Sequence, residues 1–151
     1  MTASPELLTV DLSGDERRFV WQAMYQWQFS ASDAPFPYQV LGLSSWREFC
    51  ELTHRLAHAV TDREPLGELD WMRVLYLTEC SWASNIVGSG LDFSIVTEFS
   101  DIDCLSMLRH VQRKIGTVAQ PECCSRTAGK ARRNSDTALS DRPPRQIRQS
   151  R

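Results

Sequence analysis

The segment GELDWMRVLYLTECSWASNIVGSG, residues 67–90, decides the fold of this chain of 151 residues. It is the longest run with apolar residues at helical spacing, so we expect a helix over residues 67–87 against which the other helices pack. An apolar face this broad is typical of a helix that its neighbours cover. Gly67 can cap the start of the helix, and Gly88 with Gly90 can end it. The residues expected on the covered face are Met72, Leu75, Tyr76, Cys80, Ala83, Ile86 and Val87, with Trp71 and Trp82 at its edge.

Glu79 falls within this apolar face, where a carboxylate must be paired, protonated or reached by water. One interpretation is an ion pair with an arginine of another helix, for which Arg17, Arg18 and Arg113 are the candidates. A second is a bend of the helix that turns Glu79 towards solvent. A third is a functional acid, base or ligand, because perturbed carboxylates also mark functional sites.

Charge divides the chain into two parts. Residues 1–116 carry 9 Lys and Arg against 16 Asp and Glu, a balance of −7, and residues 117–151 carry 8 against 3, a balance of +5. After residue 116 the helical periodicity is lost, and the segment holds too few large apolar residues to offset the entropy of ordering. We therefore expect a helical globular domain over 1–116 and a disordered basic tail over 117–151.

The five cysteines include no CxxC pair, which favours free thiols and a reducing, cytoplasmic setting. Cys50, Cys80 and Cys104 lie inside helical patterns, as buried free thiols usually do. Cys123 and Cys124 are adjacent in the tail and match no common zinc spacing. We see no signal peptide and no long apolar run, and we expect neither membrane association nor a cofactor.

Three further helices are predicted from caps and apolar spacing. Capping boxes at Ser13–Glu16 and Ser45–Glu48 begin helices over 14–28 and 46–60. Ser100 caps a last helix that Gly116 ends. Together with the central helix, they predict a mainly α fold, a compact orthogonal bundle of about four helices.

Two short segments leave open a minor two-stranded β element. LLTVDL (7–12) partly alternates between apolar and polar residues, and LDFSIVTEF (91–99) contains residues that favour strands but is equally compatible with an ordered loop. If both are strands, we expect them to pair with each other, supported by the helices behind them.

Glu51, His54 and His58 share one face of the helix over 46–60. A helical Glu-x-x-His is half of a di-iron carboxylate pattern, and two histidines four residues apart can chelate zinc. The apolar residues of this helix point the other way, so we interpret the trio as a solvated face, with a metal site as the alternative. His110 is expected to be a surface residue.

Small and polar residues follow the central helix. Backbone amides in such a turn can bind an anion, but the order of residues matches neither a Walker loop nor a nucleophile elbow. We interpret the segment as a turn and helix cap, with a ligand site as the alternative. The residues concerned are Ser84, Asn85, Gly88, Ser89, Gly90 and Asp92.

The chain contains no complete catalytic set, so our first hypothesis is a non-enzymatic protein-interaction or regulatory module. Its partner would be another protein or a second copy of the chain. Aromatic residues at helix edges favour partner surfaces. The candidates are Trp21, Trp46, Trp71 and Trp82.

Two alternative functions stay open. One is a small-ligand-binding or enzymatic domain around Glu79 and the polar turn. The other is nucleic-acid binding through the tail, because basic side chains can neutralise phosphates, although the tail has no aromatic residue for base stacking. The basic residues of the tail are Arg126, Lys130, Arg132, Arg133, Arg142, Arg145, Arg148 and Arg151.

Overall fold

Helix α1 (Gly14–Gln26) lies at the centre of the helical body. In the computed structural model, which describes residues 6–33 and 35–119, α1 packs against α2 (Trp46–Asp62), α3 (Glu68–Ala83) and α5 (Asp101–Ala119). Helix α3 packs mainly against α1 and α5. The prediction that the other helices pack around residues 67–87 therefore holds for α1 and α5, whereas the main packing partner of α2 is α1.

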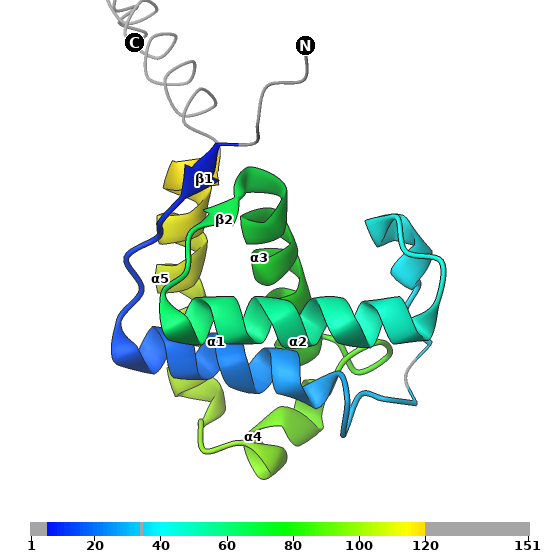
Figure 1. Cartoon of the computed structure of the whole chain (residues 1–151). Coiled ribbons are helices and arrows are strands. Elements are labelled where there is room, and N and C mark those ends of the chain that lie inside the picture. The colour runs from blue at the N-terminus through cyan, green and yellow to red at the C-terminus, as the bar shows by residue number, and fades with distance from the viewer. Residues whose placement is uncertain (1–5, 34, 120–151) are drawn as a thin grey trace, which may run out of the picture. The chain divides into compact units, whose positions relative to one another are not determined.

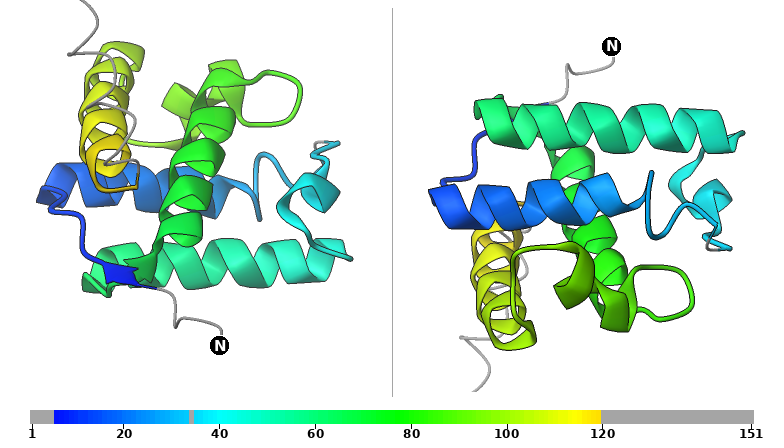
Figure 2. Two further views of the ribbon diagram at one scale, coloured as in Figure 1. Left: turned by 90° about the horizontal axis from the view of Figure 1, so that it is seen from above. Right: turned by 90° about the horizontal axis from the view of Figure 1, so that it is seen from below.

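The four long helices form two layers. Helices α1 and α2 lie side by side in opposite directions, and α3 and α5 form a second antiparallel pair that crosses the first (Figure 1, Figure 2). The predicted mainly α orthogonal bundle is confirmed. Within the described part of the chain, no helix is both long and apolar enough to cross a membrane.

A two-stranded β element joins the N-terminal segment to the start of α3. Strand β1 (Leu7–Leu8) pairs antiparallel with β2 (Leu66–Gly67), with Leu7 opposite Gly67 and Leu8 opposite Leu66. The indole Nε1 of Trp71 donates a hydrogen bond of 2.9 Å to the carbonyl oxygen of Leu8. This bond fixes the strand pair to the first turn of α3.

Of the two alternatives left open for residues 91–99, a strand or an ordered loop, the strand is wrong. This segment forms a 3-10 turn η2 (Gly90–Asp92), one turn of helix α4 (Phe93–Val96) and a bend. Phe93 and Phe99 are buried, whereas Ile95 is exposed. The two phenylalanines, rather than strand pairing, attach the segment to the body.

The buried face of α3 also differs from the prediction. The helix ends at Ala83, four residues before the predicted end, and Tyr76, Ala83 and Ile86 are exposed. Because apolar residues occur on almost every side of this helix, periodicity alone does not select the face that its neighbours cover. The buried residues of α3 are Trp71, Val74, Leu77, Thr78 and Ser81.

Two hydrophobic clusters fill the body. The larger lies between the helix layers and continues to the loop before α2, where Phe36 packs on Trp27 and Phe49 at ring-centroid distances of 4.8 and 5.0 Å. That loop contains the 3-10 turn η1 (Tyr38–Leu41). In the smaller cluster, Phe19 of α1 makes edge contacts with Phe93 and Phe99 at 5.9 and 5.7 Å. The smaller cluster thus connects α1 to α4 and to the start of α5.

Asp70 in the first turn of α3 connects this helix to α2. It accepts hydrogen bonds from Arg55 of α2 at 2.9 Å and from Arg73 at 3.1 Å. Burial alone would raise the pKa of Asp70, but the two guanidinium groups outweigh burial and lower it.

Glu16 is the one buried carboxylate among residues 6–33 and 35–118, with 5% of its surface exposed. Its Oε2 atom accepts the backbone N–H of Ser13 at 2.6 Å, while the Ser13 hydroxyl accepts the N–H of Glu16, so the predicted capping box is confirmed. The same Oε2 accepts the Lys114 ammonium of α5 at 2.7 Å, and Nδ1 of His110 lies 3.7 Å from Oε1. The cap of α1 is therefore also its link to α5.

The pKa of Glu16 lies below its ordinary value. Burial opposes ionisation, but the hydrogen bonds from Lys114 and from the Ser13 backbone outweigh it and lower the pKa below 4.5. The ionised carboxylate therefore stabilises the folded protein above this pH, and the stabilisation is lost as the pH falls through the lowered value.

We expect Glu16→Gln to lower the free energy of unfolding at neutral pH by about 1–2 kcal/mol, near the lower end for hydrogen bonds to charged groups because Lys114 is partly exposed. Glutamine can still complete the capping box, so the substitution mainly removes the charge. Urea unfolding from pH 7 to pH 3 should show the difference from the unsubstituted protein shrinking as the pH falls below 4.5.

The matched control is Glu48→Gln, at the equivalent position of α2. The Glu48 carboxylate is exposed and accepts the N–H of Ser44 at 2.7 Å, rather than that of Ser45 as a full capping box requires. This substitution should change the stability by less than about 0.5 kcal/mol. An equal effect of both substitutions would show that the link to Lys114 contributes nothing.

Candidate functional site

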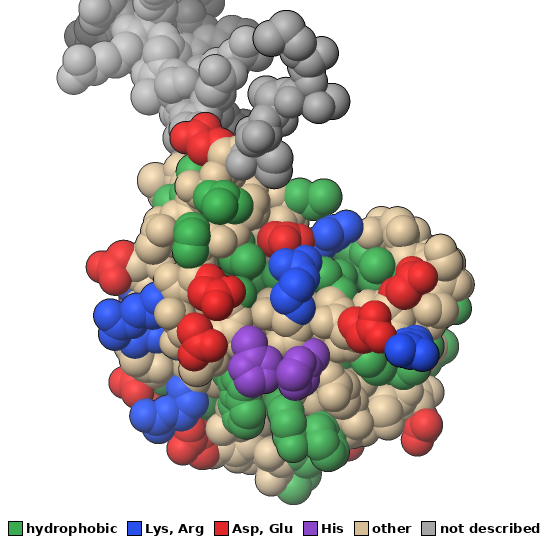
Figure 3. All heavy atoms as spheres, viewed as in Figure 1, with side chains coloured by type: hydrophobic (Ala, Val, Ile, Leu, Met, Phe, Trp, Pro, Cys, Tyr) green, Lys and Arg blue, Asp and Glu red, His purple; other side chains and the backbone are tan. Residues whose placement is uncertain are grey.

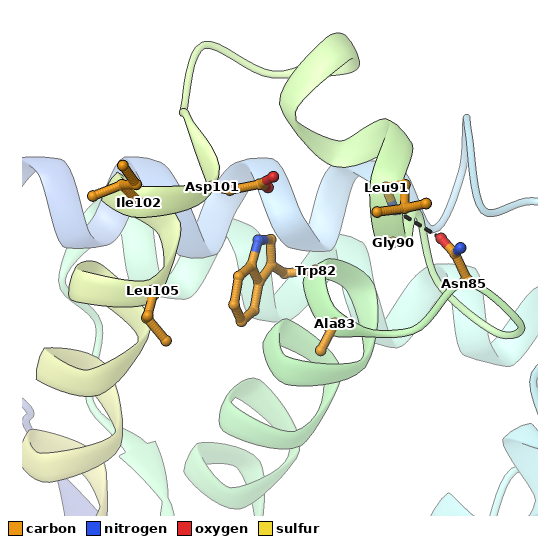
Figure 4. A pocket seen from close by; sticks show the side chains of 8 residues that line it. All are labelled: Trp82, Ala83, Asn85, Gly90, Leu91, Asp101, Ile102 and Leu105. Carbon is orange, nitrogen blue, oxygen red and sulfur yellow. Dashed lines mark hydrogen bonds between the residues drawn. The ribbon is translucent and has the colours of Figure 1, made fainter.

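An apolar groove of about 580 Å³ lies between the end of α3 and the start of α5. Trp82 and Ala83 of α3 form one side, Ile102 and Leu105 of α5 form the other, and the turn between these helices closes one end (Figure 4). The lining residues are Trp82, Ala83, Asn85, Gly90, Leu91, Asp101, Ile102 and Leu105.

The turn that closes the groove is built by its own polar side chains. The Ser84 hydroxyl accepts the N–H groups of Ile86 and Val87 at 3.3 and 3.1 Å, and the Asn85 side-chain oxygen accepts the N–H of Leu91 at 2.7 Å. The N–H of Ser89 donates to the carbonyl of Ser81 at 2.8 Å. These bonds support the predicted turn and helix cap.

Two glycines in this turn are required by its geometry. A Cβ atom on Gly88 would lie 2.0 Å from the carbonyl oxygen of Cys80. Gly90 has a φ of +50°, and a Cβ there would lie 2.1 Å from the Asn85 side-chain oxygen. Glycine allows the turn to fold tightly onto the end of α3, which places Leu91 at the groove.

The groove walls expose large aliphatic side chains. Ile102 is 82% exposed and Leu91 is 74% exposed, and Leu105 is partly exposed. Contiguous apolar surface of this kind is typical of an interaction site. No predicted site residue points to these three positions. Ile102 lies off the buried stripe of α5, whereas helical spacing predicts that Leu105 faces inward with Cys104 and Leu108, which is wrong because Leu105 is 49% exposed.

The charge beside the groove is acidic. Asp101 lines the groove, and its side chain points towards the Trp82 indole (Figure 4). Asp92 and Asp103 are exposed nearby in the chain. Asp101 and Asp103 also lie in the first turn of α5, where the helix dipole favours negative charge, and the Ser100 hydroxyl accepts the N–H of Asp103, as expected for its cap.

Glu79 lies outside the groove lining. It is partly buried, and its Oε1 atom accepts a hydrogen bond of 2.6 Å from the Gln112 side chain of α5. The described residues give Glu79 no arginine partner: Arg17 donates to the carbonyl of Leu12, Arg18 binds Asp15 and Glu98, and Arg113 donates to the carbonyl of Arg109. The expectation of an arginine ion pair is therefore wrong.

The four tryptophans proposed for a partner surface do not form one surface. Trp71 is only 3% exposed, so the expectation is wrong for this residue. Trp46 packs partly buried against Phe49, and Trp21 stacks on Tyr25 at a centroid distance of 5.0 Å. Only Trp82 lines the apolar groove.

The predicted metal trio is brought together only in part. His54 and His58 are exposed on α2 with 3.2 Å between their Nε2 atoms, whereas Glu51 binds Arg47 at 2.9 Å. Among the described residues, no group of three or more His, Cys, Asp or Glu side chains is placed to hold an ion. His110 is exposed, as expected.

Cysteines 50, 80 and 104 are free thiols, and burial raises the pKa of each, to about 12 for Cys104. Residues 117–119, predicted to belong to the tail, extend α5 to Ala119. The rest of the tail, with Cys123, Cys124 and the basic residues proposed for nucleic-acid binding, lies outside the described residues.

We expect Gly88→Ala to destabilise the protein by about 1–3 kcal/mol, because the new methyl group meets the backbone of α3 and forces the turn to move. Gly116→Ala is the matched control: its Cβ has no neighbour within 4 Å, and alanine favours α5, so stability should rise by about 0.5–1 kcal/mol. Urea midpoints measure both effects. Equal stability of the two variants would contradict the tight packing at Gly88.

Comparisons of the chain with protein-family models, with curated proteins and with solved structures find no match.

Proposed function

We propose that this protein is a non-enzymatic protein-interaction module, and that the groove around Trp82 receives an amphipathic helix of a partner protein. The observation that carries the proposal is the exposed aliphatic wall formed by Leu91, Ile102 and Leu105. Burying such side chains against a partner releases about 25 cal/mol per Å² of apolar surface, which makes them natural anchor points.

The shape of the site favours a helix. The groove lies between two helices, and amphipathic helices commonly insert apolar side chains spaced three and four residues apart into such grooves. A volume of about 580 Å³ has room for several such side chains.

The charge of the site favours basic residues beside the apolar face of the partner. Asp101 lines the groove, Asp92 and Asp103 are close to it in the chain, and residues 1–116 carry a balance of −7. Complementary charge mainly raises the association rate and selects among partners. The proposed partner segment is therefore an apolar helix flanked by lysine or arginine.

The groove does not resemble a reaction site. Among its eight lining residues, Asp101 is the one ionisable side chain, so the lining lacks a paired acid and base or an activated nucleophile. The Ser84 hydroxyl accepts a backbone N–H group of the turn, and the Ser89 hydroxyl shares a hydrogen bond of 2.6 Å with the hydroxyl of Ser30 in the segment after α1.

A displayed library of amphipathic helices with varied flanking charge tests this function. Binders selected on the full chain should carry basic flanks and should bind Ile102→Asp at least about tenfold more weakly, because a hot-spot residue typically accounts for more than 1 kcal/mol. Ile95→Asp is the matched control, since Ile95 is 79% exposed but does not line the groove.

Binders that tolerate Ile102→Asp as well as Ile95→Asp would reject the groove as the docking site. Binders that are sensitive to Ile102→Asp but carry acidic flanks would reject the charge argument. Self-association that Ile102→Asp abolishes, measured by sedimentation at increasing protein concentration, would make a second copy of the chain the occupant.

A further inference from the structure

Two histidines on the exposed face of α2 are in direct contact with each other. His54 and His58 are exposed, their Nε2 atoms are 3.2 Å apart, and their ring centroids are 4.4 Å apart. Figure 3 shows a pair of histidine side chains adjacent to each other on the exposed face of the α1–α2 layer. The Nε2 atoms of the two rings therefore face each other at the exposed surface of α2.

We propose that His54 and His58 form a two-ligand site for a borderline transition-metal ion such as Zn²⁺, Ni²⁺ or Cu²⁺. A tetrahedral ion at the usual Zn–N distance of about 2.0–2.1 Å holds two nitrogen ligands roughly 3.3–3.4 Å apart. The observed separation of 3.2 Å is close to this value. The two rings need little movement to bind one ion.

The chemistry of binding follows from the hydrogen bond that the ion replaces. With both rings neutral, one Nε2–H donates to the lone pair of the other Nε2. When the ion binds, the donor ring carries its proton on Nδ1 instead, and both Nε2 lone pairs coordinate. Two neutral imidazoles thus bind without net release of a proton.

The remaining coordination positions are open. Glu51, the carboxylate of the predicted trio, binds Arg47 at 2.9 Å. The described residues supply no third ligand. Water or an external ligand completes the coordination, so the site exchanges its ion readily. Imidazole favours the borderline ions named above, whereas Ca²⁺ and Mg²⁺ prefer oxygen ligands.

Neither histidine is needed for packing, which makes the site testable by substitution. Helix α2 buries the opposite face through Phe49, Leu52 and Leu56. Glutamine has a helix propensity at least equal to that of histidine, so His54→Gln and His58→Gln should leave the fold intact.

Calorimetric titration of the full chain with Zn²⁺, Ni²⁺ and Ca²⁺ tests the proposal. The adjacent thiols of Cys123 and Cys124 would compete for metal, so every protein carries Cys123→Ser and Cys124→Ser. The thiols of Cys50, Cys80 and Cys104, of which only the last is fully buried, compete less, because their raised pKa keeps them protonated at neutral pH. We expect one ion per chain for Zn²⁺ and Ni²⁺ and no binding of Ca²⁺.

His54→Gln and His58→Gln should each weaken binding by at least about tenfold, since even outer-shell partners of a metal ligand contribute 10–100-fold in affinity. His110→Gln and Glu51→Gln are the controls and should leave the affinity nearly unchanged. Equal affinity of the His54→Gln/His58→Gln double variant would overturn the site. A loss with Glu51→Gln as large as that with His54→Gln would overturn the two-ligand assignment.

Discussion

The contact between Glu16 and Lys114 is the constraint on which the arrangement of the helices depends. It joins the first turn of α1 to the last part of α5 across 98 residues of chain, at 2.7 Å. Because the same carboxylate caps α1 through Ser13, one side chain sets both where the central helix begins and where the last helix crosses it. A buried carboxylate is stable only when its charge is compensated and its hydrogen bonds are made, and here α5 supplies the cation.

This constraint also bears on the groove. Helix α5 meets α1 at Lys114 and, at its other end, meets the cluster of Phe19 and Phe99 through Cys104 and Leu108. With both ends held, the first turn of α5 faces the last turn of α3 without closing on it, and the space between them is the apolar groove. The exposed aliphatic surface thus follows from the contacts that hold α5 through Lys114 and through Cys104 and Leu108.

Local signals in the sequence are sufficient for the four long helices and for most of their caps, although the Ser45–Glu48 box is only half formed and α3 ends at Ala83. The Ser13–Glu16 box, the Ser100 cap and the mainly α fold follow from short-range patterns and are confirmed. Contacts between distant segments could not be predicted in this way. The sequence predicts Glu16 only as a cap, because nothing near it in the sequence points to Lys114. It places Glu79 on the covered face, because α3 is apolar on nearly every side.

The candidate site shows the same limit. The sequence predicts the turn over residues 84–92 as a helix cap and gives Trp82 as one of four candidates for a partner surface. Helical spacing alone does not distinguish Trp71, which is 3% exposed, from Trp82, which lines the groove. The difference arises from position along α3, because the strand pair covers its first turn and only the turn after Ala83 flanks its end.

The most enclosed carboxylates of the body and the polar side chains of its main turn make structural contacts. The buried carboxylate of Glu16 and the partly buried carboxylate of Asp70 are each held by cationic side chains that lower their pKa, so neither is poised to exchange a proton near neutral pH. The polar turn at Ser84 and Asn85 uses its side chains on its own backbone. The two proposed binding surfaces lie on different elements: the apolar groove lies between α3 and α5, and the imidazoles of His54 and His58 lie on α2. Because these two surfaces share no residue, the proposed ion on α2 and the proposed helix in the groove would bind independently.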